Sequence, residues 1–189
     1  LYKGETVALV GESGSGKTTI VRRLLEYCPQ LEFSVSATSR APRGTERHGV
    51  DYYFLSSEEF ARAVARQEFV EWEEVYKGTC YGTLRSEVER IWERGHIIIF
   101  DVDVMGGIRL KEIFGEQALS LFIMPPSVEE LERRLVGRGT DSPETIAKRI
   151  AKAESEIAKA PRFDHIVVND RLETAVEEAR RIVEDFIGR

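Results

Sequence analysis

The amino-acid sequence predicts an α/β fold with a parallel sheet covered by helices on both faces. Three observations predict it. Short apolar runs rich in Val, Ile and Phe alternate with longer segments of helical period along most of the 189 residues, as in strands joined by crossover helices. A glycine-rich loop follows the first apolar run, and the alternation breaks only once. The length fits one domain with small inserted lobes.

The expected elements follow the chain in order. Each expected core strand is a short apolar run, and these runs cover residues 6–10, 33–36, 97–101, 120–124 and 165–168. The expected helices cover residues 17–27, 84–93, 104–114, 128–136, 143–159 and 172–187. Ser127 and Ser142 mark helix starts, because a serine side chain can accept from the free amides of the first turn. Pro143 supports the second start, because proline fits the first turn of a helix. Between the second strand and residue 84, short strands at 51–55 and 68–73 flank a helix at 57–66, which predicts an inserted lobe.

Residues 11 to 18 read Gly-Glu-Ser-Gly-Ser-Gly-Lys-Thr, a GxxxxGKT loop between the first strand and the first helix. Glycines allow successive amides to point at phosphate oxygens, and the helix N-terminus adds positive potential. In such a loop, Lys17 reaches the β- and γ-phosphates, and the Thr18 hydroxyl binds Mg²⁺. A glycine-rich turn without a ligand is the alternative, but strand, loop and helix occur in the required order. The loop therefore predicts a nucleoside triphosphate site.

Arg40 and Arg43 stand three apart beside a proline at the exit of a strand. Two guanidinium forks can converge on one dianionic phosphate. A solvated surface pair is the commoner outcome of this spacing. The pair gains weight because transfer of a γ-phosphate requires a second phosphate site.

Composition excludes several function classes. The net charge of −6 gives no basic footprint for nucleic acid. Cys28 and Cys80 have neither CxxC nor metal-ligand spacing, which indicates a reducing compartment and no structural zinc. Cys80 is expected in a loop that reads Gly-Thr-Cys-Tyr-Gly. No apolar run reaches the roughly 20 residues of a membrane span, and no signal peptide is recognisable. We expect a cytoplasmic enzyme without nucleic-acid or membrane partners, either a monomer or a dimer.

Several motifs together resemble the guanylate kinases, of the P-loop nucleoside monophosphate kinase group. The matching stretches are the phosphate loop, FSVSATSRAPR from Phe33, GVDYYF from Gly49, EFVEW from Glu68, Tyr81-Gly82, Asp101 to Asp103, PPSVEELERRLVGRGT from Pro125 and VVND from Val167. The resemblance implies a three-layer P-loop NTPase fold and Mg-dependent transfer of the ATP γ-phosphate to GMP. It also implies a core at about 1–33, 84–126 and 160–189, a nucleotide-monophosphate lobe at about 34–83 and a helical lid at about 127–159.

The resemblance also assigns roles to single residues. GMP would contact Ser36, Arg40, Arg43, Tyr52, Glu71, Tyr81, Thr83, Asp103 and Arg149. ATP would contact Gly11, Ser13, Gly14, Ser15, Gly16, Lys17, Thr18, Thr19, Arg134, Arg138 and Asn169. Mg²⁺ would be held by Thr18 and by Asp101, either directly or through water. The migrating charge would be stabilised by Lys17, Arg40, Arg134, Arg138 and Arg149, with no protein nucleophile.

The chemistry of Glu71 supports its part independently. Guanine presents N1–H and an amino group side by side, and one carboxylate can accept from both. Adenine would leave that carboxylate unsatisfied, and a site of this kind discriminates by roughly 10⁴-fold. The alternative is a solvated strand residue.

Two departures from the family pattern and two rival interpretations remain open at this stage. The opening residues are like those of an ABC transporter ATPase, but no LSGGQ-like segment and no Glu after Asp101-Val-Asp follow. Glu12 brings a negative charge into the phosphate loop, where it either points to solvent or weakens ATP binding. A non-catalytic, phosphopeptide-binding guanylate-kinase-like domain is the rival function, and another purine monophosphate such as dGMP is the rival substrate.

Overall fold

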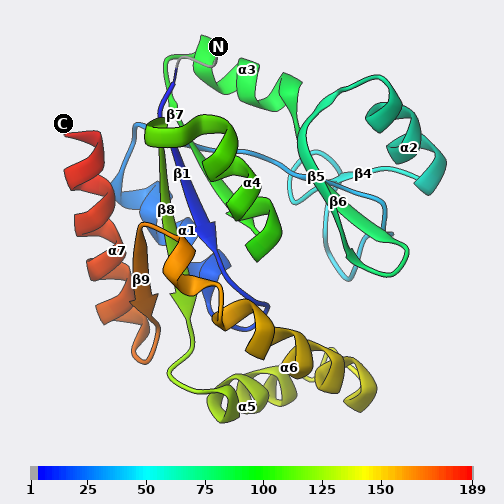
Figure 1. Cartoon of the computed structure of the whole chain (residues 1–189), viewed down its shortest axis with the longest axis vertical. Coiled ribbons are helices and arrows are strands. Elements are labelled where there is room, and N and C mark those ends of the chain that lie inside the picture. Colours follow the sequence, from blue (N-terminus) through cyan, green and yellow to red (C-terminus); the bar gives the residue numbers. More distant parts are fainter. Residues whose placement is uncertain (1–3, 189) are drawn as a thin grey trace.

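The computed structural model describes residues 4–188, and its core is a five-stranded parallel sheet in the order β2-β7-β1-β8-β9 (Figure 1). Because β1 lies at the centre, the loops after β1 and β7 leave the same edge of the sheet side by side. The strands are β1 (Thr6–Val10), β2 (Leu31–Phe33), β7 (Ile97–Val102), β8 (Ala118–Met124) and β9 (His165–Val168).

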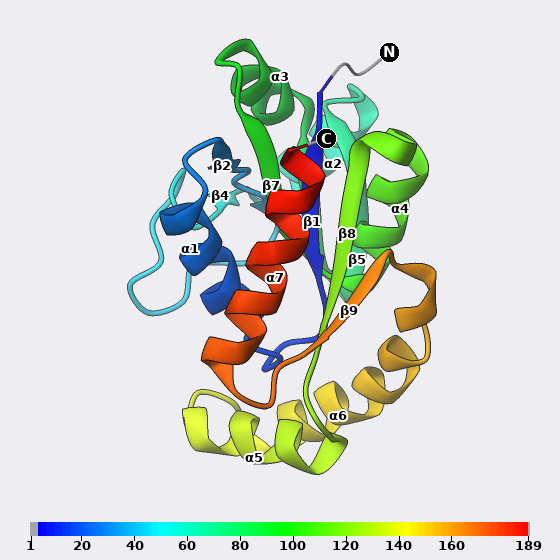
Figure 2. The same cartoon turned by 90° about the vertical axis from the view of Figure 1, so that its left-hand side faces the viewer.

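Helices cover both faces of this sheet, giving three layers (Figure 2). Alternate residues of β1 point to opposite faces: Val7 and Leu9 pack against α1 (Lys17–Tyr27) and α7 (Leu172–Ile187). Ala8 and Val10 pack with residues of α3 (Arg85–Glu93) and α4 (Val104–Phe114). A strand buried on both sides reads as a continuous apolar run, as the sequence does here. No helix within residues 4–188 is long and apolar enough to cross a bilayer.

The inserted lobe is a second, four-stranded sheet in the order β4-β3-β6-β5. It has a small core of its own around Phe60 and Phe69, and Ser56 and Glu59 form a capping box at the start of its helix. Its entry and exit are tied together, because the Val35 amide donates to Glu87 in α3 at 3.3 Å. Its elements are β3 (Ala37–Thr38), β4 (Tyr53–Phe54), α2 (Ser57–Ala65), β5 (Phe69–Tyr76) and β6 (Thr79–Leu84).

Two helices, α5 (Val128–Arg138) and α6 (Pro143–Ile157), form a hairpin beyond the carboxyl edge of the core sheet (Figure 1). Leu131, Leu135 and Ala153 bury its apolar faces together. Gly139 ends α5 with φ of 65°, a left-handed turn that favours glycine. Short 3-10 turns, η1 (Gly115–Gln117) and η2 (Ala160–Arg162), complete the chain.

Most predicted elements are confirmed, several at both ends: the strands 6–10 and 165–168 and the helices 17–27, 104–114 and 172–187. Others shift by a few residues. The helices 84–93, 128–136 and 143–159 are 85–93, 128–138 and 143–157, and the strands 97–101 and 120–124 are 97–102 and 118–124. In the lobe, 51–55, 57–66 and 68–73 become 53–54, 57–65 and 69–76.

Two predictions about the start of the lobe and its last strand are wrong. The second core strand is not 33–36 but Leu31–Phe33, because the chain leaves the core sheet after Ser34 donates to Ile99 O. The carbonyl of Ser36 already accepts from Tyr53 in the lobe. Cys80 lies in strand β6, not in a loop, and it pairs with Glu74 of β5. Periodicity missed the first because one extended segment leaves the core sheet and enters the sheet of the lobe. It missed the second because Gly78 and Gly82 give that segment the composition of a loop.

Candidate active site

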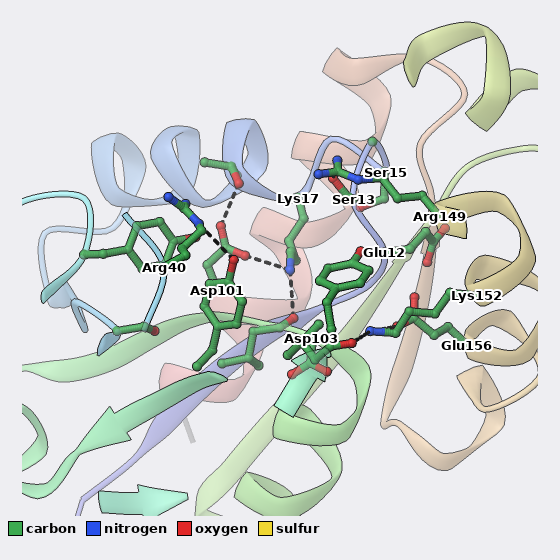
Figure 3. Close-up of a pocket in the computed structure, with 18 of the residues that line it drawn as sticks. Glu12, Ser13, Ser15, Lys17, Arg40, Asp101, Asp103, Arg149, Lys152 and Glu156 are labelled. Carbon is green, nitrogen blue, oxygen red and sulfur yellow. Dashed lines mark hydrogen bonds and ion pairs between the residues drawn. The ribbon is translucent and has the colours of Figure 1, made fainter. Parts of the chain in front are cut away.

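A cavity of about 270 Å³ opens where the core sheet, the lobe and the helical hairpin meet (Figure 3). Its walls come from the loop after β1, the end of β7, the strands of the lobe and helix α6. The predicted residues that line it are Ser13, Gly14, Ser15, Gly16, Lys17, Thr18, Thr19, Ser36, Arg40, Arg43, Tyr52, Glu71, Tyr81, Asp101, Asp103, Arg138 and Arg149. Predicted triphosphate and monophosphate contacts therefore share one space.

The phosphate loop is held in a shape that only glycine allows at several positions. Gly11, Gly14 and Gly16 have φ of 151°, 91° and 89°. A Cβ on Gly16 would overlap the side-chain Nδ2 of Asn169, and one on Gly11 would overlap the backbone oxygen of Ile123. The loop is thus packed tightly against the end of the core sheet, with the start of α1 behind it.

Asn169 and Arg134 lie outside the cavity lining and act on the loop from behind. The buried Asn169 side chain donates to Ser15 O at 2.9 Å, and Arg134 donates to Asn169 O at 2.9 Å and to Glu130 at 3.0 Å. Both residues were predicted to contact ATP. In this arrangement they stabilise the conformation of the phosphate loop, which is itself expected to contact ATP.

Lys17, Thr18 and Asp101 form a compact charged cluster at the carboxyl ends of β1 and β7. Lys17 Nζ lies 2.8 Å from Asp101 Oδ1 and donates to Val102 O at 2.8 Å. The Thr18 hydroxyl donates to Asp101 Oδ2 at 2.7 Å. Burial lowers the pKa of Lys17, but the charge and hydrogen bond of Asp101 outweigh it and leave the pKa raised. Lys17 therefore keeps its positive charge inside the cavity.

The oxygen atoms of this cluster fit a small hard cation. Mg²⁺ prefers a few protein oxygens together with phosphate and water ligands, and Thr18 and Asp101 present such oxygens beside the phosphate loop. Within residues 4–188 no three Asp, Glu, His or Cys side chains gather as a cage. A metal ion here would thus share its ligands with the nucleotide.

Arg40 is oriented by several partners on the lobe side of the cavity. Glu46 accepts from both ends of its guanidinium at 2.7 and 2.9 Å, and Arg40 Nε donates to the Tyr81 hydroxyl at 3.0 Å. The hydrogen bonds from Arg40 lower the pKa of Glu46, so the pair is ionised. Tyr52 lies beneath the guanidinium, 4.9 Å from ring centroid to Cζ. Exposed Arg43 lines the same wall.

Glu71 reaches the far end of the cavity from β5. It is 6% exposed, and Thr83 donates to its Oε1 at 2.7 Å across the β5–β6 pair. Burial raises its pKa to about 7, and the nearby Asp103 adds to this effect. Asp103 is fixed in turn, because its Oδ1 accepts from the Gly106 amide at the start of α4. Thr83 itself lies behind Glu71 rather than on the cavity wall.

Helix α6 closes the phosphate end of the cavity (Figure 3). Arg149 Nη1 donates to the Ser13 hydroxyl of the phosphate loop at 2.7 Å and lies 3.2 Å from Asp141. Arg138, at the end of α5, is exposed to solvent and lines the cavity. Two guanidinium groups of the hairpin thus face the phosphate loop.

Comparison with known proteins identifies the family. The guanylate kinase family model matches residues 3–186. The chain belongs to the guanylate kinase family. It is 52% identical to the guanylate kinase of Bacteroides fragilis, over 98% of this chain and 91% of that protein. With the enzyme of Porphyromonas gingivalis it shares 53% identity over 97% of this chain and 98% of the relative.

The fold agrees with the family. The crystal structure of guanylate kinase from Anaplasma phagocytophilum superposes with a TM-score of 0.79 at 31% identity, covering 98% of this chain and 87% of that one. The inserted four-stranded unit occupies the segment predicted as the monophosphate lobe, and the α5–α6 hairpin occupies the segment predicted as the lid.

Sequence reasoning missed several residues of this guanylate kinase cavity. Tyr76, Lys152 and Glu156 line it, and Glu46 orients Arg40. None belongs to a motif whose spacing carries a chemical meaning. Glu12 was noted as a departure, and the structure turns it inward rather than to solvent: it is 5% exposed, and neither carboxylate oxygen has a hydrogen-bond partner.

Proposed function

We propose that this nucleoside monophosphate kinase transfers the γ-phosphate of Mg-bound ATP to GMP, giving ADP and GDP for purine nucleotide metabolism. One observation carries the proposal. The Lys17–Thr18–Asp101 cluster and Glu71, which Thr83 holds from behind, line the same cavity, so a triphosphate-type site and a base-reading carboxylate share one space. Membership in the guanylate kinase family supports the choice of guanine.

On the ATP side, the amides of the glycine loop and the start of α1 would hold the phosphates. Lys17 would contact the β- and γ-phosphates. Mg²⁺, held with Thr18 and Asp101, would supply positive charge at the phosphate oxygens when bound. Lys17 already carries its charge in the folded protein, so the site is electrostatically prepared before nucleotide enters.

On the GMP side, Arg40, Arg43, Tyr52 and Tyr81 would bind the monophosphate. Glu71 would accept from the guanine N1–H and amino group, with Thr83 keeping one oxygen in place and Ser36 alongside. Ionised Glu71 is needed for both hydrogen bonds. An adenine edge would strand that buried carboxylate, which supports rejection of AMP.

The reaction itself needs positioning rather than a protein nucleophile. Charge spreads over the migrating phosphoryl group, and the cations that would neutralise it are Lys17, Arg40, Arg138 and Arg149, with Arg134 holding the loop. Closure of the lid over the cavity would keep water from the γ-phosphate. We also propose a cytoplasmic location, which the free thiols of Cys28 and Cys80 support.

The test is ADP formation with MgATP and GMP, run beside AMP, CMP and UMP. We expect turnover with GMP but not with AMP, CMP or UMP. This turnover should be lost in a Lys17→Ala variant that still binds GMP. Folded protein that binds GMP or a phosphopeptide without turnover would instead favour the phosphopeptide-binding alternative.

A further inference from the structure

Helix α6 of the lid touches the monophosphate lobe directly across the cavity. Lys152 Nζ donates to Val75 O at 2.9 Å and lies 4.5 Å from the centroid of the Tyr76 ring. Val75 and Tyr76 are the last two residues of β5, in the same strand as Glu71. One ammonium group therefore connects two units that are separate in the sequence and carry separate cores.

The Lys152 side chain is held in place rather than free in solvent. Glu156, one turn further along α6, lies 3.6 Å from Nζ and is 7% exposed. An ammonium group has three donors, and the carbonyl, the carboxylate and the aromatic face surround it on different sides. A partly buried ammonium group with these three partners is held in one position. A displacement of the lobe is therefore passed on to helix α6, and a displacement of α6 to the lobe.

The same helix contacts the phosphate loop. Arg149, one turn before Lys152, donates to the Ser13 hydroxyl at 2.7 Å. Figure 3 shows Arg149, Lys152 and Glu156 approaching the cavity from this one helix. Helix α6 thus contacts the loop expected to hold ATP through Arg149 and the lobe expected to hold GMP through Lys152.

We propose that Lys152 is a positioning residue that couples GMP binding to ATP binding by joining the lid to the monophosphate lobe. The proposal rests on the function proposed above, because it concerns those two substrates. The contacts of Lys152 with the end of β5 and of Arg149 with Ser13 are made in the same arrangement, so GMP that stabilises the lobe in this position also stabilises α6 over the phosphate loop. Linkage requires the reverse as well: bound ATP tightens GMP binding by the same factor.

The coupling factor is the ratio of the GMP dissociation constant without the ATP analogue to that with it, and the test measures this factor at equilibrium. The dissociation constant of GMP is determined by calorimetry with and without a non-hydrolysable imido analogue of ATP and Mg²⁺. In Lys152→Met the side-chain stem remains and the ammonium is lost, and we expect the coupling factor to fall about tenfold, within the usual range of such couplings. The affinity for GMP alone should change little, and Lys152→Arg should restore most of the coupling.

A matched control separates coupling from general stability. Lys148 lies one turn earlier on α6 and is exposed, so Lys148→Met should leave the coupling factor unchanged. Thermal unfolding midpoints of the two variants are compared directly. Equal coupling in the wild-type protein and Lys152→Met would overturn the proposal. Failure of the wild-type protein to bind GMP at all would overturn the proposed function as well.

A double-mutant cycle with Tyr76→Leu tests the partner. This substitution removes the ring beside Lys152. It should lower the coupling factor when it is made in the wild-type background, and it should have little further effect when it is added to Lys152→Met. Fully additive effects would mean that the two side chains act independently, which contradicts the proposed contact.

Discussion

The phosphate loop and the proposed guanine pocket belong to one cavity, but they are built in different ways. Residues 11 to 18 are contiguous, and their shape is imposed by glycines and by the adjoining strand and helix. The guanine pocket combines Ser36, Glu71 and Thr83 from separate strands or loops of the lobe. A site built locally depends on backbone conformation, whereas a site built from distant segments depends on the packing and charge of a few side chains.

Loss of Lys17 is expected to have the largest effect. Lys17→Ala removes the cation that pairs with Asp101 and is proposed to contact the phosphates, and kcat should fall by about 10³-fold or more, the size typical of a lost transition-state charge contact. GMP affinity should change little, because the two ends of the cavity are separate. Steady-state kinetics and GMP calorimetry check this, with exposed Lys77→Ala as the control.

Glu71→Gln should affect the other end selectively. The amide can accept only one of the two guanine hydrogen bonds, so KM for GMP should rise by about 10²-fold while KM for ATP stays within a factor of about two. Glu68→Gln, an exposed position just before β5, is the matched control. Equal losses for both nucleotides would mean that the two ends are not separable.

GMP binding should depend on pH through Glu71. Its pKa is raised to about 7 by burial, and only the ionised form accepts both guanine donors. GMP affinity should therefore fall as pH drops through 7, by up to about tenfold per pH unit below the pKa.

The phosphate of GMP titrates in the same range, so the comparison is with Glu71→Gln across pH 5.5 to 8.5. The variant should lack the part of the pH dependence that belongs to the carboxyl group. The same pH profile in both proteins would refute the assignment.

Glu12 gives the smallest expected effect and tests the phosphate end. Burial raises its pKa to about 7, with Glu156 adding to the shift, so above pH 7 an unpaired charge faces the site of the phosphates. Glu12→Gln should lower KM for ATP about threefold at pH 8. At pH 5.5 it should change KM hardly at all, because the protonated carboxyl group of Glu12 and the amide of the variant are both neutral. The measurement is KM for ATP of both proteins at the two pH values. A higher KM in Glu12→Gln than in the wild-type protein at pH 8 would contradict the expected repulsion.

The difference between the two ends also explains what the sequence could predict. The phosphate loop, its strand and its helix follow from residue spacing, and the structure has them at the predicted bounds. The pairing of Glu71 with Thr83 depends on a strand, β6, that was expected as a loop. Its place near guanine came only from the resemblance of motifs. Lys152 and Glu46 belong to no motif, since their roles arise where separate units meet.

The tie between Val35 and Glu87 has a consequence for protein engineering. It fixes the start of the inserted lobe beside Glu87 of α3, the helix that follows the lobe, and the lobe has its own small core. The two chain connections between the lobe and the core therefore lie side by side, and Arg109 of α4 and Lys152 of α6 make further contacts with β5. A grafted replacement lobe that keeps these two anchoring positions, Val35 and Glu87, would exchange the proposed GMP-binding residues while leaving the phosphate loop and α1 in place.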